Sequence, residues 1–206
     1  YDEKIRRFVA DGGRFLTTFF SGYVDDHDLV TIGGYPGRLR DILGIWVEEE
    51  DALPAEVHNS FTYKGVTYPA MLLCDLLHLE GAQSLCGYEQ DFYAGMPALT
   101  RNVFGKGAAY YAATRSNEAF YRTIVAEICE ESGIRPIIDT PEHIEVTKRS
   151  NANGTFLFIL NHDREAHSIT LNCCGMDILT DTEYETGDVL TLPANDAAIV
   201  RINPAD

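Results

Sequence analysis

Several features that mark other classes of protein are missing from this sequence. Its 206 residues contain no apolar run that approaches the ~20 residues of a membrane-spanning helix. No Cys-x-x-Cys pair occurs, and no two histidines stand four residues apart, so the usual spacings of zinc ligands are missing as well. The residues from Tyr1 to Arg7 are charged and do not form the apolar centre of a signal peptide.

The chain begins at Tyr1 without a methionine, and residues 1–10 already have the periodicity of a helix. No clear capping residue precedes this helix, although Asp2 is a candidate. We therefore expect the chain to be a fragment cut from a longer protein. In that case, the missing signal peptide says nothing about where the parent protein resides.

Motifs that carry chemistry are also missing. The segment Gly105-Lys106-Gly107 lacks the upstream glycine and the Ser or Thr of a phosphate-binding loop, so we expect a tight turn between two strands. Ser21 follows a predicted strand, but it stands in neither a nucleophile elbow nor a dinucleotide fingerprint. The six histidines are scattered: His27, His58, His78, His143, His162 and His167. We assign no catalytic, cofactor-binding or metal-binding residue.

Positive charge is scarce in this chain. It has 16 Lys and Arg against 32 Asp and Glu, which gives a formal net charge of −16. An acidic protein repels the phosphate backbone of nucleic acids and the surface of anionic membranes. We therefore expect neither as a partner.

Cysteine is present, but in no pattern typical of disulfides. The number is odd: Cys74, Cys86, Cys129, Cys173 and Cys174. The first two lie in apolar, strand-like runs, and Cys129 lies in a predicted helix. Buried free thiols are typical of proteins in the reducing cytoplasm, so the sequence favours a cytoplasmic location.

Carboxylates, by contrast, are plentiful in two acidic runs, Asp25-Asp26-x-Asp28 and Glu48-Glu49-Glu50-Asp51. Both lie in loop-like sequence, and we expect them to be on the solvated surface. Glu48 directly follows an apolar strand, so a position in a cleft or an interface stays open for it.

The first two thirds of the chain alternate between helix and strand patterns. A buried strand is predicted over 14–20, a short helix from Pro36 to Leu43 that Gly44 ends, and a short strand over 45–47. This alternation favours a parallel α/β unit. Strand patterns then extend from 61 to 114, and a helix with Ser116 as its candidate cap runs to Gly133.

Beyond a linker at 137–141, every segment is strand-like. Alternating or apolar runs lie at 144–149, 155–160, 168–171, 177–179, 189–192 and 197–202, separated by turn residues. Short strands at this spacing are typical of a small antiparallel sandwich. We expect two domains, 1–138 with an α/β fold and 139–206 with an antiparallel β-sandwich, and we place Phe156 and Phe158 in the core of the second.

The order of several landmarks carries a resemblance to a known family. They are Gly12-Gly13, Ser21 to Asp25, Gly33-Gly34-Tyr35-Pro36-Gly37, Leu39 to Glu50, Ala98 to Tyr111 and Leu160-Asn161-His162. Together they resemble the middle and C-terminal parts of the family 42 glycoside hydrolases, which are mostly bacterial β-galactosidases. Members of this family have a catalytic (β/α)₈ barrel, then a flavodoxin-like or glutamine-amidotransferase-like α/β domain, then a small β-sandwich.

The resemblance implies what the missing part of the protein does. The family hydrolyses terminal β-D-galactosides with retention, using two glutamates of the barrel, and it typically forms homotrimers through the middle domain. Neither glutamate has a counterpart here, so the chain is expected to be a non-catalytic fragment that supports assembly. The choice of galactoside depends on the barrel and cannot be read from this chain.

Two other functions stay open from the residues alone. The β-domain is a candidate carbohydrate-binding module if Tyr184 is exposed as a platform for sugar. The first domain is a candidate amidotransferase-like hydrolase, although no nucleophile–His pair supports this reading. As surfaces for subunit contact we expect Trp46 and the region of Tyr23 and Tyr35.

Overall fold

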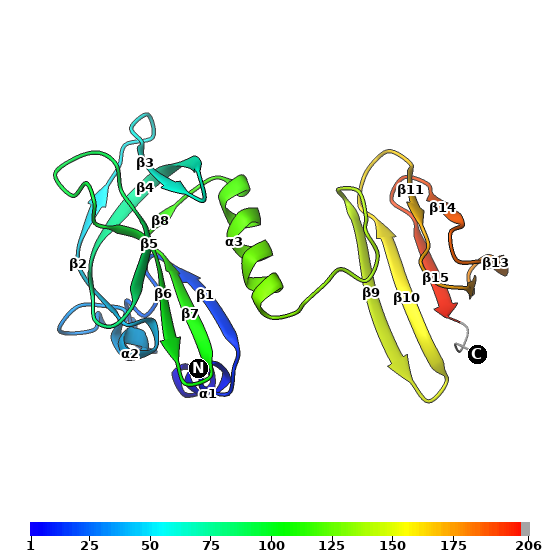
Figure 1. Ribbon diagram of the computed structural model, residues 1–206, viewed down its shortest axis with the longest axis horizontal. Coiled ribbons are helices and arrows are strands. Elements are labelled where there is room, and N and C mark those ends of the chain that lie inside the picture. Colours follow the sequence, from blue (N-terminus) through cyan, green and yellow to red (C-terminus); the bar gives the residue numbers. More distant parts are fainter. Residues whose placement is uncertain (203–206) are drawn as a thin grey trace. The chain divides into compact units, whose positions relative to one another are not determined.

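The computed structural model describes residues 1–202 (Figure 1). Its contacts divide the chain into two compact units, Tyr1–Ile134 (unit 1) and Arg135–Asp206 (unit 2). The helices of the described residues lie in unit 1: α1 (Asp2–Ala10), the 3₁₀ turn η1 (Gly37–Leu39), α2 (Arg40–Leu43) and α3 (Glu118–Glu131). Within residues 1–202, no helix is long and apolar enough to cross a membrane.

The strands of unit 1 form two sheets. The first has the order β1 (Arg14–Thr18), β7 (Gly107–Ala112), β6 (Pro97–Phe104) and β5 (Gln83–Gly87). In the second, β4 (Val66–Leu79) pairs with β2 (Ile45–Ala52), β3 (Asn59–Tyr63) and β8 (Thr114–Arg115).

The prediction of a parallel α/β unit is right only in part. In the first sheet β1 and β7 are parallel, whereas β5–β6 and β6–β7 are antiparallel. For β6 and β7 the reason is the tight turn at Gly105-Lys106, which returns the chain directly, because a parallel pair needs a long crossover connection. The chain is rich in strands, and a flavodoxin-like arrangement is not confirmed.

Two local predictions also need correction. The strand expected to be buried over 14–20 is half-exposed and ends at Thr18, because β1 lies at the edge of its sheet. The cap of α3 is Asn117, whose side chain accepts a hydrogen bond from the Phe120 amide at 3.1 Å. Ser116 instead donates to the Pro69 carbonyl at 2.7 Å.

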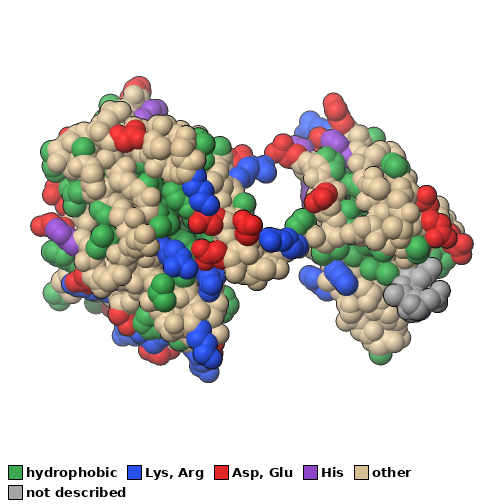
Figure 2. Space-filling view, viewed as in Figure 1, with side chains coloured by type: hydrophobic (Ala, Val, Ile, Leu, Met, Phe, Trp, Pro, Cys, Tyr) green, Lys and Arg blue, Asp and Glu red, His purple; other side chains and the backbone are tan. Residues whose placement is uncertain are grey.

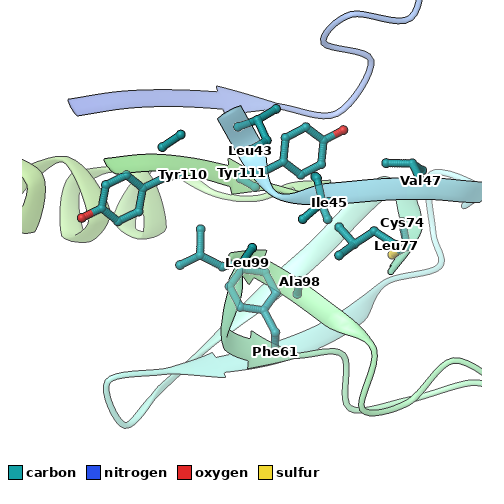
Figure 3. Packing of buried hydrophobic residues seen from close by; sticks show 14 of the residues in the cluster. Leu43, Ile45, Val47, Phe61, Cys74, Leu77, Ala98, Leu99, Tyr110 and Tyr111 are labelled. Carbon is teal, nitrogen blue, oxygen red and sulfur yellow. The ribbon is translucent and has the colours of Figure 1, made fainter. Parts of the chain in front are cut away.

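The core of unit 1 gathers side chains from both sheets and from α2 and α3. Figure 3 shows Leu43, Ile45, Phe61 and Leu99 packed together with Tyr111. Every residue of β7 is buried, which explains its small and aromatic sequence, GAAYYA. Because β7 is paired on both sides and covered on both faces, it is the best-protected strand of this sheet.

Unit 2 consists of antiparallel strands. Its larger sheet has the order β13 (Thr182–Tyr184), β12 (Gly175–Asp177), β15 (Ala197–Ile202), β10 (Gly154–Asn161) and β9 (Ile144–Asn151), and β11 (His167–Thr170) pairs with β14 (Val189–Leu192). The sequence patterns had predicted these strands apart from β13 and β12; the strand expected at 177–179 shares only Asp177 with β12, and Ile178 and Leu179 lie in the turn that follows. The core between the two sheets is aliphatic and includes Leu157, Ile159 and Val200.

The prediction that Phe156 and Phe158 lie in this core is wrong. Both are half-buried, whereas Leu157 and Ile159 between them are fully buried. Successive side chains of a strand point to opposite faces, so β10 turns its aliphatic residues inward and its aromatic residues to the outer face of the sheet. The sequence FLFIL is apolar on both faces and does not show which face is buried.

Candidate assembly surface

The most unusual surface of unit 1 is the loop of residues 20–32, which follows β1 and is called here the 20–32 loop. Five large apolar side chains of this loop are exposed: Phe20, Val24, Leu29, Val30 and Ile32. Ile32 is fully exposed to solvent. The other exposed apolar residues of unit 1 are more widely spaced in the sequence. Exposed apolar side chains are therefore most frequent in this loop.

The 20–32 loop is internally ordered. It folds back on itself through an antiparallel bridge between Val24 and Val30, and the Asp25 amide donates to the Leu29 carbonyl at 2.9 Å. At the tip, the Asp25 carboxylate accepts hydrogen bonds from the amides of His27 and Leu29, at 2.8 and 3.0 Å. Such side-chain bonds hold a turn in shape, so the apolar residues project from a defined scaffold.

Close backbone contacts fix the base of the loop and explain part of the glycine-rich segment that follows it. A side chain at Gly22 would place its Cβ 2.3 Å from the Pro36 carbonyl oxygen. At Gly34, a Cβ would lie 2.1 Å from Nε1 of Trp46, the atom that donates to the Gly33 carbonyl at 3.0 Å. Both glycines also have positive φ angles, so only glycine fits without strain.

Beneath this segment lies a buried carboxylate. Asp75 on β4 is fully buried and accepts hydrogen bonds from the hydroxyls of Tyr35 and Tyr111, both at 2.6 Å. Burial raises the pKa of Asp75 to about 7, although the two tyrosine hydrogen bonds act in the opposite direction. The tyrosine hydroxyl thus ties the segment that carries the 20–32 loop to the central strand of the second sheet.

Next to the loop, a shallow hollow is lined by Tyr23, Val30, Thr31, Gly34, Tyr35, Val47, Glu48, Glu49 and Glu50. It therefore joins the 20–32 loop to the second acidic run, where β2 continues beyond the short strand expected at 45–47. Glu48 lines this hollow, in agreement with the position in a cleft that the sequence had left open for it. Its carboxylate also pairs with Nε2 of His78 at 2.6 Å.

The side chain of Trp46 belongs to a stacked cluster on the neighbouring surface. Its ring stacks on His78, with 5.0 Å between ring centroids, and the Arg40 guanidinium lies 5.5 Å from the Trp46 ring centroid. Arg40 in turn makes two hydrogen bonds to Glu80, at 2.5 and 2.6 Å. The carboxylates of Glu48 and Glu80 are therefore engaged by basic partners within the fold.

The surface residues predicted for subunit contact need correction. Trp46 is half-buried in its stacked cluster, and Tyr35 is buried, with 6% of its surface exposed. Tyr23 is half-buried and packs edge-to-face on Tyr35, 5.2 Å between centroids. Sequence reasoning missed the exposed apolar residues from Leu29 to Ile32, because the aspartates before them and the glycines after them are typical of a polar loop.

The first acidic run lies at the tip of the 20–32 loop, and Asp25, Asp26 and Asp28 are all exposed, as predicted. Ligand atoms of Asp25, Asp26 and His27 lie within 4.8 Å of one another. Asp25 already holds the turn through two amides, which gives it a structural role in the loop. The run therefore adds negative charge to an apolar surface.

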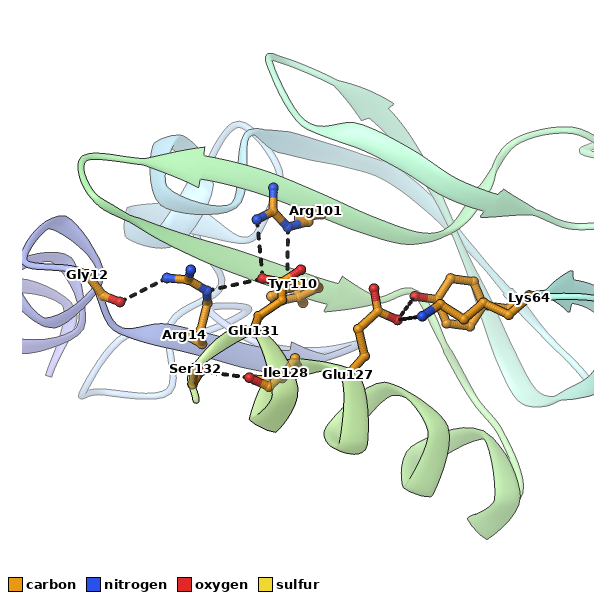
Figure 4. A network of polar contacts seen from close by, with 10 residues as sticks. Gly12, Arg14, Lys64, Arg101, Tyr110, Glu127, Ile128, Glu131 and Ser132 are labelled. Carbon is orange, nitrogen blue, oxygen red and sulfur yellow. Dashed lines mark hydrogen bonds and ion pairs between the residues drawn. The ribbon is translucent and has the colours of Figure 1, made fainter. Parts of the chain in front are cut away.

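On the face of unit 1 that carries α3, acidic and basic side chains interleave (Figure 2). Glu131 near the end of α3 accepts hydrogen bonds from the Tyr110 hydroxyl at 2.8 Å and from Arg14 and Arg101 at 3.3 Å each (Figure 4). Burial alone would raise the pKa of Glu131, but Tyr110 and Arg101 together lower it. One carboxylate thus fastens the helix to strands β1, β6 and β7.

The serine, the glycine-rich turn and the cysteines considered in the sequence analysis have structural roles or are at least half-buried. Ser21 is hydrogen-bonded to Thr17, and Gly105 and Lys106 form the predicted turn between β6 and β7. The five cysteines are free thiols; Cys74 is buried and the other four are half-buried. Burial raises the pKa of Cys86 to about 12, which keeps that thiol protonated and weakly reactive.

The histidines do not converge on one site. His27, His58, His78, His143 and His162 are exposed, and His162 pairs with Glu145 at 3.0 Å. His167 is half-buried and pairs with Asp163 at 2.7 Å. In unit 2, Tyr184 packs against the aliphatic core, so it does not form the exposed sugar platform that the alternative function needs.

Comparison with known families agrees with this division of the chain. The family described as the β-galactosidase trimerisation domain matches residues 1–135, and the β-galactosidase C-terminal domain matches residues 143–201. The chain belongs to the family 42 β-galactosidases. The apolar 20–32 loop thus lies in the part of a family 42 β-galactosidase that is described by its role in trimer formation.

Curated members of the family 42 β-galactosidases show how much of the whole this chain represents. The β-galactosidase BgaP of Planococcus sp. (strain L4) is 44% identical over 195 residues, which cover 92% of this chain and 29% of BgaP. The β-galactosidase BgaB of Geobacillus sp. (strain Y412MC61) is 36% identical, covering 97% of this chain and 30% of BgaB. The chain therefore spans about three tenths of the length of these relatives.

Solved structures of β-galactosidases have the same fold over this region. The β-galactosidase of Bacillus circulans sp. alkalophilus superposes with a TM-score of 0.89 at 39% identity, over 98% of this chain and 31% of that enzyme. The β-galactosidase of the haloarchaeon Halorubrum lacusprofundi still superposes with a TM-score of 0.77 at 15% identity. The fold therefore tolerates wide sequence change.

Proposed function

We propose that this chain is the non-catalytic C-terminal region of a retaining β-galactosidase that hydrolyses terminal β-D-galactosides. The observation that carries the proposal is the pair of family matches over residues 1–135 and 143–201, in a chain that spans about 29% of BgaP. The contacts of Glu48 and Glu80 also support it, because these two carboxylates pair with His78 and Arg40 of the same chain. The galactoside would bind in an upstream barrel, where two glutamates would carry the reaction.

We assign to residues 1–138 the role of an oligomerisation domain in a homotrimer, and to residues 139–206 the role of a C-terminal β-sandwich. The family description of residues 1–135 supports the first role. A flavodoxin-like or amidotransferase-like sheet would require parallel strands contributed by residues upstream of Tyr1. The edge strand β1, which pairs with β7 alone among the described strands, offers a place for them.

The acidic composition supports the absence of nucleic acid and membrane from the partners of this protein, since the net charge is −16. The five free thiols support a cytoplasmic location. Both statements concern the parent enzyme as well as this chain. They are tested by locating the enzyme in fractionated cells and by its behaviour on a nucleic-acid column.

Two measurements test the proposed function. The purified chain should not hydrolyse an aryl β-galactoside, whereas the parent enzyme that contains the barrel should. Light scattering behind a size-exclusion column should give the parent enzyme three times the mass of one subunit. Hydrolysis by the chain alone would contradict the non-catalytic assignment, and a monomeric parent at every concentration would contradict the role in assembly.

A further inference from the structure

We propose that the 20–32 loop is the element of unit 1 that packs against a second copy of the chain in the assembled enzyme. This inference rests on the proposed role of unit 1 in a trimer and specifies where the contact lies. The proposal commits to a second copy as the occupant of the loop's apolar surface. Three observations support it: the exposure of the loop, its rigidity and its charge.

The exposure of the loop calls for a partner. Leu29, Val30 and Ile32 are 64, 57 and 100% exposed within four residues of sequence, and Phe20 and Val24 add 46 and 42%. Single exposed apolar residues are normal on a protein surface, but a contiguous group is typical of an interface. Burying such side chains favours association, because it removes apolar surface from water.

The rigidity of the loop makes it suited to binding. Its two arms are joined by the Thr31 amide, which donates to the Tyr23 carbonyl at 3.0 Å, and by the Val24–Val30 bridge. Its base is held by the glycine contacts and, through Tyr35, by the buried Asp75. An element that is already ordered loses little conformational entropy on binding, which raises affinity.

The charge of the loop favours a second copy over other occupants. Asp25, Asp26 and Asp28 surround its apolar residues with negative charge. A threefold assembly uses head-to-tail contacts, in which a surface meets a different surface of the next subunit. Unit 1 offers exposed basic side chains on α1, where Lys4 and Arg7 lie beside Phe8, which is 55% exposed; the same helix also carries the exposed carboxylate of Glu3.

The three α1 residues lie on one face of the helix, since positions three and four apart are neighbours. An apolar residue flanked by two cations complements an apolar loop flanked by carboxylates. Each copy of the chain thus provides both halves of a head-to-tail contact, which is the requirement for a closed ring.

The test uses the full parent enzyme with Leu29→Asp and Ile32→Asp combined. The matched control combines Val57→Asp and Val66→Asp, which replace apolar residues of the same unit that are 49 and 51% exposed. Mass is measured by light scattering over a hundredfold range of concentration, and far-ultraviolet circular dichroism and thermal unfolding check that each variant is folded.

We expect the loop variant to fall to one third of the wild-type mass at concentrations where the wild-type and the control stay trimeric. Three results would overturn the inference: a loop variant that stays trimeric with unchanged thermal stability, a control that dissociates equally, or a loop variant that stays trimeric but loses thermal stability. The last result would show that the loop packs on the barrel of its own subunit. A monomeric wild-type enzyme would instead remove the proposed role in assembly itself, so the two failures are distinguishable.

Discussion

Unit 1 buries a carboxylate, Asp75, and several tyrosine hydroxyls within its core, whereas unit 2 has an aliphatic core and buries its carboxylate, Asp177, at the end of strand β12. In unit 1, Asp75 binds two tyrosines in the interior, while Leu29 and Ile32 are left outside. In unit 2, the buried polar residues are Asn161 and Asp177, and both lie at the ends of strands. The two carboxylates thus act over different ranges: Asp75 anchors Tyr35, forty residues away in the sequence, whereas Asp177 holds the turn that directly follows its own strand, at Leu179 and Thr180.

The largest expected change in stability comes from a substitution in the aliphatic core of unit 2. Leu157→Ala removes a fully buried side chain from the core of unit 2 and should lower the free energy of unfolding by ~2–5 kcal/mol, since a cavity remains. Hydrogen exchange should show the loss in the amides of β10 and β15 while those of β7 keep their protection. Equal loss of protection in both units would contradict the separation of the two cores.

The next effect tests the buried carboxylate of unit 1. Asp75→Ala leaves the hydroxyls of Tyr35 and Tyr111 without their acceptor and should cost ~2–4 kcal/mol of unfolding free energy, measured by chemical denaturation. The control replaces all three polar groups, with Asp75→Leu, Tyr35→Phe and Tyr111→Phe, and should lose less. A triple variant that is less stable than Asp75→Ala would show that shape, and not hydrogen bonding, decides the cost.

A pH series sharpens the same point. The pKa of Asp75 is raised from its ordinary 3.8 to about 7, so the folded chain holds a proton that the unfolded chain releases between these values. This contribution to stability is complete below pH ~4 and is lost as the pH rises to 7. Asp75→Asn should therefore remove a fall of ~2 kcal/mol in unfolding free energy between pH 5 and pH 7. A variant whose stability curve parallels the wild-type curve would refute this role.

The smallest effect concerns the partly exposed network of Figure 4. Glu131→Gln keeps an acceptor for Tyr110 but removes the charge beside Arg14 and Arg101, and it should cost less than ~1 kcal/mol because surface ion pairs contribute little. The loss should shrink further in high salt. Thermal unfolding at two salt concentrations measures the loss of stability and its dependence on salt. A loss as large as that of Asp75→Ala would contradict the expectation that the exposed ion pairs contribute less than the buried carboxylate.

The sequence allowed most of the elements to be predicted, since turns such as Lys64-Gly65 and Asn151 to Gly154 mark the ends of strands clearly. It did not reveal the direction of pairing in the first sheet, because direction depends on which distant strands meet, as with β1 and β7. Asp75 was missed, although a single carboxylate within an apolar strand is a recognisable signal. Leu29 and Ile32 were missed because sequence alone cannot show that a short apolar segment stays outside the core.

The position of β1 has a consequence for how this region behaves on its own. Among the described strands it pairs with β7 only, so one row of its backbone groups faces outward. An open strand of this kind is a template on which any extended chain can add itself, and natural proteins protect such edges with charge or cover. Arg14, tied to Glu131, is the main charge along it. The solubility of this region when it is expressed alone therefore depends on whether the five residues from Arg14 to Thr18 are covered. The same point decides where an expressed fragment should begin.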